Sequence, residues 1–407
     1  MLQSKRQLIA LEDRDPLRVL FLITSMPVGG AETLLVNLIR RLDRDRFAPE
    51  LCCLKQLGPL GEELAHEIPT HSDLLLSKYD LRVFPRLVRL LCRRQIDAIV
   101  TVGAGDKMFW GRLAAWRANV PVILSALHST GWPDGISRLN RMLTPLTDAF
   151  IGVAKPHGQH LIDNEKFPSE KVCVIPNGVD VDRFSRSDES RSRLRQEVGI
   201  PAAAPVCGIV AALRTEKNHL LFVRAAEKVN CQFPHAHYVI VGDGPEREQL
   251  EQATHDANLD ERIHFLGTRS DISEILSMLD LFALTSHNEA NPVSILEAMS
   301  VGLPVVSTDV GSVSESVKHG ETGYLAKPGD ADEIARYWQK LLCDPTAASQ
   351  MGATGRQSVV NNWSLESMVL GYEELIEEIY RRKQSSNPVD TQPRAAANPM
   401  ETAQLCK

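Results

Sequence analysis

Two glutamates with seven residues between them, Glu289 and Glu297, are the side chains whose type and spacing most directly suggest chemistry in this chain. The mostly apolar run Leu279–Leu284 before them predicts a buried strand, and the apolar residues after them predict a helix. Glu289 would then lie in the loop at the carboxyl end of the strand, and Glu297 in the second turn of the helix. Ligands of open α/β sheets bind at that end of the strands. Two carboxylates there are candidates for ligand binding, and two solvated glutamates are the alternative.

The start of that helix predicts a site for an anion. Asn291 is a favourable N-cap residue, and Pro292 suits the first helical position. The first backbone N–H groups of a helix have no partner within it, so the stretch Pro292, Val293 and Ser294 offers donors to a negatively charged group. We therefore expect an anionic ligand at this loop.

Two cations occupy a similar position earlier in the chain. Val206–Ala211 reads as a strand and a helix is expected from Asn218 onward, so Arg214 and Lys217 fall in the loop between them. A guanidinium fork and a compact ammonium group suit a diphosphate. Ordinary surface charges are the alternative reading of this pair.

Two further candidates lie in the first half of the chain. Gly29 and Gly30 join a predicted strand, Arg18–Thr24, to a helix, and glycine there lets backbone approach a ligand closely. His128 follows the apolar run Pro121–Leu127, so it would project from the carboxyl end of a strand. A tight turn and a structural histidine are the respective alternatives. The Gly-x-Gly-x-x-Gly pattern of a dinucleotide site is absent from the glycine turn.

The alternation of strands and helices predicts α/β architecture with parallel sheets and crossover helices. With 407 residues, two domains are expected rather than one. Asn177 and Gly178 form a predicted turn near the end of the first domain. The expected division is a tail at 1–16, a first domain at 17–185, a linker at 186–205, a second domain at 206–364, a helix at about 365–382 and a disordered tail at 384–407.

Composition narrows the class of protein. A formal charge of −7 gives no reason to expect nucleic-acid binding. The eight cysteines contain no Cys-x-x-Cys pair, and we expect reduced, buried thiols in a cytoplasmic protein. No signal peptide or membrane-spanning run is visible. Two Asp-Arg-Asp strings, at 13–15 and 43–45, lack the preceding strand that would aim their carboxylates at a metal, so no metal is expected.

Taken together, these motifs resemble those of retaining glycosyltransferases of family 4, which have the GT-B fold. The resemblance is carried by Glu289 and the Glu297-Ala-Met sequence, by Gly29-Gly30-Ala-Glu, and by Asn177-Gly-Val-Asp. It covers about residues 17 to 382 and is densest over 206–325. It implies two Rossmann-like, doubly wound domains that face each other across a cleft, with the last helix crossing back to the first domain. The first domain would be the acceptor side and the second the nucleotide-sugar side.

The resemblance also implies roles for the candidate residues. Glu289 and His128 would flank the transferred sugar, and Glu297 would hold the ribose hydroxyls. The glycines at 29 and 30 would touch the donor phosphates or the acceptor. Family members usually carry an arginine where this chain has Ala212, so Arg214 is the candidate replacement. From the residues themselves, Gly267 lets backbone approach a base, and 267–272 is the expected nucleobase shelf.

The expected activity is retaining, metal-independent transfer of a hexose-type sugar from a nucleotide diphosphate sugar, the co-substrate, with no cofactor. The acceptor would be a glycan, a lipid-linked compound or a small molecule, in cell-surface polysaccharide or glycolipid synthesis. A nucleotide-sugar epimerase on the same fold and a non-catalytic sugar-nucleotide binding protein are the alternatives. Arg86, Arg89 and Arg93 lie on one face of a predicted helix at 85–94, which indicates either a solvated face or peripheral contact with an anionic membrane at its cytoplasmic side.

Overall fold

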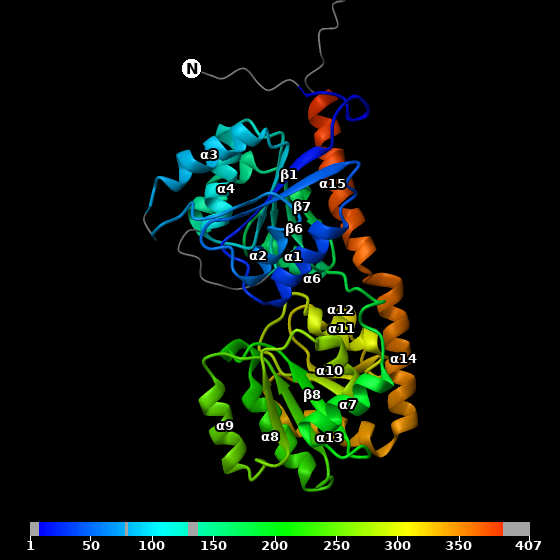
Figure 1. Ribbon diagram of the computed structural model, residues 1–407. Helices are drawn as coiled ribbons and strands as arrows, with labels where there is room; N and C mark the ends of the chain where they lie inside the picture. The colour runs from blue at the N-terminus through cyan, green and yellow to red at the C-terminus, as the bar shows by residue number, and fades with distance from the viewer. Residues whose placement is uncertain (1–7, 78–79, 129–136, 386–407) are drawn as a thin grey trace, which may run out of the picture.

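The computed structural model describes residues 8–77, 80–128 and 137–385, which form two lobes, each built on one parallel sheet (Figure 1). The first sheet has the order β3-β2-β1-β4-β5-β6-β7 and the second the order β10-β9-β8-β11-β12-β13. Helices lie on both faces of each sheet, as parallel strands require. The predicted pair of doubly wound α/β domains is therefore confirmed.

The elements of the first lobe follow the predicted alternation. Its strands are β1 (Leu17–Ile23), β2 (Phe47–Cys53), β3 (Thr70–His71), β4 (Ala98–Val102), β5 (Val122–Ala126), β6 (Ala149–Gly152) and β7 (Val172–Val174). Its helices are α1 (Gly30–Arg41), α2 (Pro59–Leu64), α3 (Val83–Arg94), α4 (Asp106–Arg117), α5 (Ser137–Met142) and α6 (Lys155–Asp163). The short elements α2 and β3 carry too little periodicity to be predicted.

The second lobe repeats the pattern. Its strands are β8 (Val206–Val210), β9 (His237–Val241), β10 (Ile263–Gly267), β11 (Leu281–Leu284), β12 (Val305–Thr308) and β13 (Gly323–Ala326). Its helices are α7 (Asp188–Val198), α8 (His219–Asn230), α9 (Arg247–Asp256), α10 (Ile272–Met278), α11 (Val293–Val301), α12 (Val313–Ser316), α13 (Ala331–Cys343) and α14 (Pro345–Asn362).

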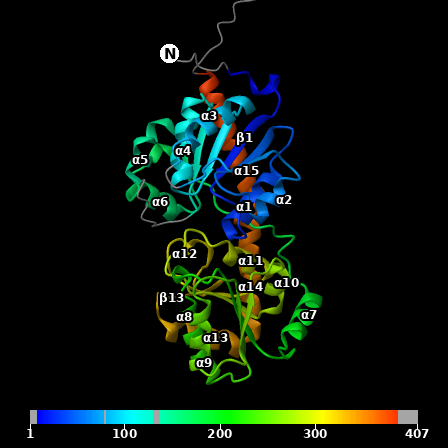
Figure 2. The ribbon, with the colours of Figure 1, turned by 60° about the vertical axis from the view of Figure 1, so that its left-hand side comes forward.

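The strand order reverses at one place in each sheet, between β1 and β4 in the first and between β8 and β11 in the second. The loops after these strands diverge to opposite faces, which opens a crevice at their carboxyl ends. The glycine pair follows β1, Lys217 follows β8, and Glu289 follows β11. Figure 2 shows α1 and α6 of the first lobe facing α11 and α12 of the second, so these loops lie between the lobes.

The last two helices join the lobes. The helix α14 packs on the core of the second lobe, while α15 (Leu365–Ser385) contributes to the core of the first (Figure 1). The predicted crossing back of the last helix is therefore confirmed. At the crossing, Val179 N–H donates to Trp363 O at 2.9 Å, and Leu365 N–H donates to Val179 O at 3.1 Å. A Cβ on Gly178 would lie 2.5 Å from the Ser364 carbonyl oxygen, so only glycine permits this approach.

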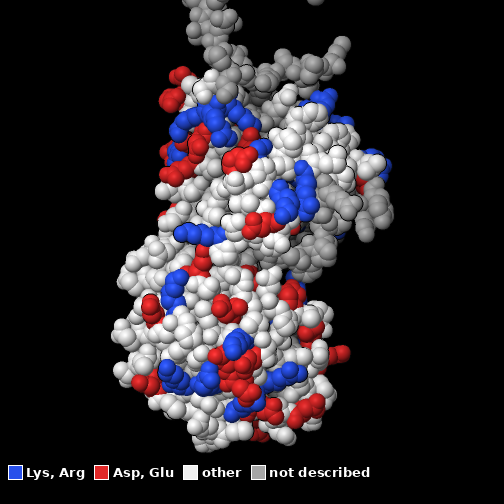
Figure 3. Space-filling view, turned by 180° about the vertical axis from the view of Figure 1, so that it is seen from behind, with Lys and Arg blue, Asp and Glu red and all other residues white. Residues whose placement is uncertain are grey.

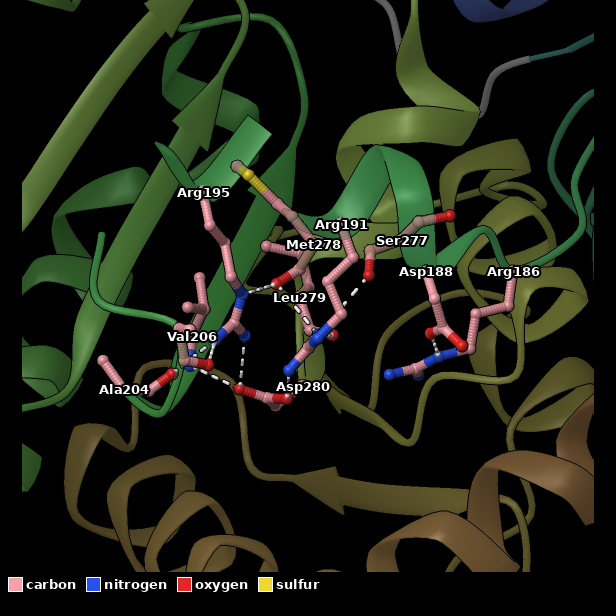
Figure 4. A network of polar contacts seen from close by, with 11 residues as sticks. Arg186, Asp188, Arg191, Arg195, Ala204, Val206, Ser277, Met278, Leu279 and Asp280 are labelled. Atoms are coloured by element: carbon pink, nitrogen blue, oxygen red, sulfur yellow. Dashed lines mark hydrogen bonds and ion pairs between the residues drawn. The ribbon is translucent and has the colours of Figure 1, made fainter. Parts of the chain in front are cut away.

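The predicted linker at 186–205 is wrong, because most of this segment is the helix α7, which packs on α10 of the second lobe. Leu194 is buried in the core, and Arg195 is only 3% exposed. Figure 4 shows how Arg191 and Arg195 converge on Asp280. Arginines that look like linker charges in the sequence instead bind carbonyl groups at the end of α10, where backbone acceptors have no helical partner.

Replacing Arg195 with methionine is expected to destabilise the second lobe by about 1–3 kcal/mol, the usual cost of leaving a buried acceptor unpaired. The guanidinium donates to Met278 O, Ala202 O and Ala204 O at 2.8–2.9 Å and to Asp280. In the variant Arg191 still binds Met278 O and Asp280, whereas the buried Ala204 O loses the donor that Arg195 supplied. Urea unfolding measures the loss. Arg193→Met, on the exposed face of the same helix, is the control and should change stability by less than about 1 kcal/mol. Equal losses for the two variants would contradict the anchoring role.

The predicted tails are also shorter than expected in their described parts. Residues 8–16 are attached to the first lobe, since Leu8 is buried and Arg14 forms an ion pair with Asp97 at 2.6 Å. Residues 384 and 385 belong to α15, and the remainder of both tails lies outside the described residues. The prediction of buried thiols holds for Cys52, Cys53 and Cys207 and is wrong for three exposed cysteines, Cys92, Cys231 and Cys343. Cys173 is partly buried, and Cys406 lies outside the described residues.

Candidate functional site

An ion pair joins the two loops at the switch point of the second sheet. The Nζ atom of Lys217, after β8, lies 2.6 Å from Oε1 of Glu289, after β11. The hydroxyl of Ser286 donates to the same oxygen at 2.6 Å. Glu289 is 8% exposed, so its carboxylate is stabilised by a direct cation rather than by bulk water. The structure thus brings Glu289 and Lys217 together from the two predicted loops.

The backbone around this pair is held from two sides. Gly311 has φ +55°, and a Cβ there would lie 1.8 Å from the Glu289 carbonyl oxygen, so the turn after β12 presses directly on the Glu289 loop. Ser312 N–H donates to the same carbonyl at 3.1 Å. The Thr285 hydroxyl contacts the Lys217 carbonyl oxygen at 3.2 Å, which ties the two loops together. These contacts fix the ion pair before any ligand arrives.

Arg214 is placed differently from Lys217. Its side chain is 62% exposed, and its nearest carboxylate is that of Glu216 at 3.9 Å. Its charge acts on Glu32 at the start of α1 in the other lobe, so the guanidinium faces the space between the lobes. The structure therefore brings Lys217 to Glu289 and leaves Arg214 exposed, with only the longer contact to Glu216 among the described residues.

Glu297 lies in the second turn of α11 as predicted, and it is partly buried. Burial raises the pKa of its carboxyl group to about 8, against a smaller opposing effect of the Arg183 charge. Within the described residues it has no hydrogen bond or ion pair. The structure thus places Glu297 on the same helix as the anion site but brings it beside Arg183 rather than against Lys217.

The prediction that Asn291 caps α11 is wrong. The N-cap residue is Pro292, the helix begins at Val293, and no side chain caps it. The side chain of Asn291 is instead used in a contact with the first lobe, where its Nδ2 donates to Val153 O at 2.9 Å. The first N–H groups of α11, at Val293 and Ser294, have no side-chain acceptor in the part of the chain that the structure describes, so the anion site at this helix start remains a prediction.

The first lobe contributes His128 and the glycine pair. His128 follows β5, and burial together with the Lys107 charge lowers its pKa to about 4, so the imidazole is neutral at neutral pH. It is hydrogen-bonded to the Asn177 side chain, while its Nδ1 is buried without a partner among the described residues. Gly29 is the N-cap of α1. A Cβ on Gly30 would meet nothing within 4 Å, so no neighbouring protein atom requires glycine at this position. A ligand that approaches the backbone closely would require it.

The segment proposed for the nucleobase is ordered by its own charges. Gly267 ends β10 with φ +66°, and its carbonyl accepts from Gly242 N–H at 2.9 Å. Arg269 binds Asp271 at 2.7 Å and also pairs with Glu197. These contacts shape the segment 267–272 but do not test base binding, which stays a prediction.

Sequence reasoning gives no site role to four residues that the structure brings there: Ser286, Glu32, Lys107 and Asn177. In the sequence, Glu32 stands out only within the glycine motif, and Asn177 only in a turn and its motif. Lys107 follows β4, one of the two strands at the switch point of the first sheet, and that position is a signal that could have found it. Burial raises the pKa of Glu32, and the Lys107 and Arg214 charges oppose this, which identifies all three as neighbours.

The family follows from comparison with known proteins. The family model described as glycosyl transferases group 1 matches residues 190–358, and the model described as glycosyltransferase family 4 matches residues 28–183. The chain belongs to glycosyltransferase family 4, group 1. The two matches cover the two lobes, and the residues of the Lys217–Glu289 pair both fall within the first of them. The predicted family is thus confirmed, and the chain is a glycosyltransferase.

Relatives of this glycosyltransferase act on different acceptors. It is 27% identical over 328 residues to the N-acetyl-alpha-D-glucosaminyl L-malate synthase of Bacillus anthracis, covering 78% of this chain and 84% of that protein. It is 27% identical over 361 residues to the UDP-Gal:alpha-D-GlcNAc-diphosphoundecaprenol alpha-1,3-galactosyltransferase of Escherichia coli, covering 84% of this chain and 92% of that protein. The crystal structure of Anabaena Alr3699/HepE in complex with UDP matches with a TM-score of 0.78 at 24% identity, covering 89% of this chain and 100% of that chain, which supports the GT-B fold. None of the described helices is long and apolar enough to cross a membrane.

Proposed function

We propose that this glycosyltransferase moves a hexose-type sugar from a nucleotide diphosphate sugar to an acceptor with retention of anomeric configuration and without a metal ion. The observation that carries the proposal is the Lys217–Glu289 ion pair at the switch point of the second sheet. A fixed cation and a fixed carboxylate a few ångströms apart can stabilise a leaving diphosphate and an oxocarbenium-like sugar at the same time.

The remaining residues are assigned around this pair. Lys217, the exposed Arg214 and the start of α11 receive the diphosphate, and Glu297 receives the ribose hydroxyls. Glu289 and the neutral His128 flank the sugar. Because Oε1 of Glu289 is already bound by Lys217 and Ser286, we assign Glu289 to positioning the sugar rather than to covalent attack. The leaving phosphate then serves as the base that takes the acceptor proton on the same face.

The acceptor is proposed to be a glycan, a lipid-linked compound or a small molecule, in the synthesis of cell-surface polysaccharide or glycolipid. The names of the relatives support this range, since one describes an L-malate product and another a diphosphoundecaprenol-linked sugar. A non-catalytic binding protein is the second candidate, and the observation that favours it is Ala212 with an exposed Arg214 that pairs only with Glu216, at 3.9 Å, among the described residues.

A donor screen tests the proposal directly. Thermal shift with UDP-, GDP- and ADP-sugars is expected to raise the melting temperature for one nucleotide, because a ligand at 100 times its Kd stabilises the folded state by about 2.7 kcal/mol. The selected donor is then incubated with acceptors, and the anomeric configuration of the product is read by NMR. Stabilisation without transfer would favour the binding protein, and conversion of the free nucleotide sugar to its epimer would favour an epimerase.

A second part of the proposal concerns the membrane surface. In the predicted basic face of α3, Arg86 is used by the protein itself, since it binds Asp80 at 2.7 Å and Leu74 O at 2.9 Å. Arg89 and Arg93 are exposed, and Leu81 just before the helix is 71% exposed. A helix with exposed cations, preceded by an exposed leucine, has both kinds of side chain that bind anionic lipid. We propose that this face touches the membrane that carries a lipid-linked acceptor.

Reversing both charges, Arg89→Glu with Arg93→Glu, is expected to weaken binding to vesicles that contain anionic lipid by about 10- to 100-fold, at roughly 1 kcal/mol per basic residue. Co-sedimentation with vesicles measures it, and uncharged vesicles are the reference. Equal sedimentation of variant and wild type would show that α3 is only a solvated helix.

The described residues of the second lobe form no comparable basic surface on the face seen in Figure 3. Lys and Arg side chains there alternate with Asp and Glu, so this face is not the basic surface that nucleic acid or anionic lipid would require.

A further inference from the structure

The side chain of Asn177 connects elements that are distant in the chain. It is 5% exposed, and its Nδ2 donates to the backbone oxygen of Asn291 at 3.0 Å. The same side chain is hydrogen-bonded to His128. Because Nδ2 of Asn177 already donates to Asn291, Oδ1 is the atom available to accept from an imidazole N–H. An amide is the side chain that supplies a donor and an acceptor at once.

Asn291 completes the connection. It is 6% exposed, and in addition to receiving Asn177 on its backbone oxygen it donates from Nδ2 to Val153 O at 2.9 Å. Asn291 belongs to the second lobe and Val153 to the first, where it follows β6. The loop that begins at Glu289 is therefore attached to the first lobe through both the backbone and the side chain of a residue only two positions away.

A neighbouring contact shows that this region is where the lobes meet. The backbone N–H of Lys155, at the start of α6, lies 3.2 Å from both carboxylate oxygens of Glu315 in α12. Segment 153–155 of the first lobe is thus held by Asn291 and by Glu315 of the second. The Glu315 side chain has no described contact with His128 or with the Glu289 loop. A variant of Glu315 therefore tests contact between the lobes without changing the contacts of Asn177 and Asn291.

A purely structural role does not account for Asn291. Its Oδ1 is buried and has no hydrogen-bond partner among the described residues. A buried acceptor without a partner is unfavourable, and an apolar residue of similar size would avoid it. The amide is therefore retained for its donor, which reaches the first lobe, and its free oxygen is a place where a hydroxyl of the bound sugar can donate.

We propose that Asn177 and Asn291 are positioning residues which, when the lobes close, place the Glu289 loop against His128 in a single geometry. This inference rests on the proposed function, because it names what orients the groups assigned to the sugar. In the structure, the chain of contacts runs from His128 through Asn177 to Asn291 and from there to Val153. Opening of the lobes separates Asn291 from Val153 and releases the sugar loop from the histidine.

The decisive variant is Asn177→Asp, which keeps the size and the acceptor of the side chain but removes the donor to Asn291. We expect kcat to fall on the order of 10- to 100-fold, as for other small misplacements of reacting groups. The Kd of the nucleoside diphosphate alone should stay within about twofold of wild type, since no proposed diphosphate ligand is changed. The new carboxylate faces His128 and opposes the nearby Lys107 charge, so the acid limb of the kcat–pH profile should move to higher pH by about one unit or more.

Three comparisons make the result decisive. Asn291→Asp, which removes the donor to Val153, should also lower kcat but leave the position of the acid limb unchanged. Glu315→Gln should alter neither quantity by more than about threefold. Asn361→Asp, an exposed amide that accepts from Gln357 on α14, is the matched control for the chemical change and should behave as wild type.

Donor-dependent compaction, measured by small-angle X-ray scattering, gives a readout that does not depend on turnover and covers the case in which one variant fails to fold. Compaction that is lost in whichever of the two asparagine variants is folded supports the proposal. Wild-type kcat and compaction in both would overturn it while leaving the proposed function in place. Failure of the wild-type enzyme to bind any nucleotide sugar would instead overturn the proposed function, and this inference with it.

Discussion

Lys217→Met is expected to lower kcat by about 10²–10³-fold, the usual effect of removing one fixed electrostatic group from a transition state. The ammonium group is the only cation in direct contact with Glu289 among the described residues, and it stands at the end of β8 where the diphosphate is proposed to leave. Its loss removes charge neutralisation from the leaving group and releases Glu289 from its position beside the sugar. Single-turnover rates with saturating donor measure the change.

The same variant is expected to lose stability, which has to be separated from the loss of catalysis. Breaking a fully buried ion pair costs about 3–5 kcal/mol, and the effect here should be smaller because Lys217 is 25% exposed. The double variant Lys217→Met with Glu289→Gln removes both charges and should regain most of that stability without regaining transfer. Recovery of transfer in the double variant would show that the pair is structural.

A matched control exists on the neighbouring helix. Lys228 of α8 pairs with Asp332 at 2.7 Å, with 43% and 83% of the two side chains exposed. Lys228→Met removes the same charge and chain length, and because this pair is exposed to solvent we expect no measurable effect on stability or on rate. Comparable rate losses for Lys217→Met and Lys228→Met would contradict the assignment of Lys217 to the site.

The elements that carry the site could be predicted because each depends on a local pattern. Buried strands such as β8 and β11 are continuous apolar runs, and the residues that follow them must lie at the carboxyl edge of a parallel sheet. Adjacency of β8 and β11 then brings Lys217 to Glu289 without further information. The pairing of a cation with a carboxylate was thus accessible from sequence order and sheet topology together.

What could not be predicted depends on contacts between distant parts of the chain. The helix α7 has the composition of a linker, because charged residues and serines dominate it. Its two buried residues, Leu194 and Arg195, can be recognised only once the helix is packed against α10. Asn291 has the local character of an N-cap, but the carbonyl that it binds belongs to Val153, 138 residues earlier. In both cases a contact with a residue distant in the sequence determines the structure, and the local sequence contains no pattern from which that contact could be predicted.

Glu297→Ala is expected to weaken donor binding by about 10²-fold or more, since a carboxylate that receives two ribose hydroxyls contributes hydrogen bonds to a charged group worth about 1.5–3 kcal/mol each. Isothermal titration calorimetry with the donor selected by thermal shift measures the Kd. The comparison variant is Glu315→Gln, a partly buried glutamate of α12 that is not assigned to the donor. An unchanged Kd for Glu297→Ala would remove the ribose assignment while leaving the Lys217–Glu289 pair untouched.

Stability and donor affinity should both depend on pH through Glu297, and the burial of this residue determines the direction of each change. Because the folded-state pKa of Glu297 is raised to about 8 from an ordinary value of 4.5, the folded enzyme holds a proton that the unfolded chain releases between those pH values. Its contribution to stability is therefore complete below about pH 4.5 and declines as pH rises toward 8. Ribose hydroxyls that donate to the ionised carboxylate favour that form, so donor binding should release a proton near neutral pH. Donor affinity of the wild-type enzyme should consequently rise with pH up to about 8 and then level off. Donor affinity of Glu297→Gln should not change over this range. Calorimetry in buffers of different ionisation enthalpy measures the proton release, which we expect for the wild type and not for the variant.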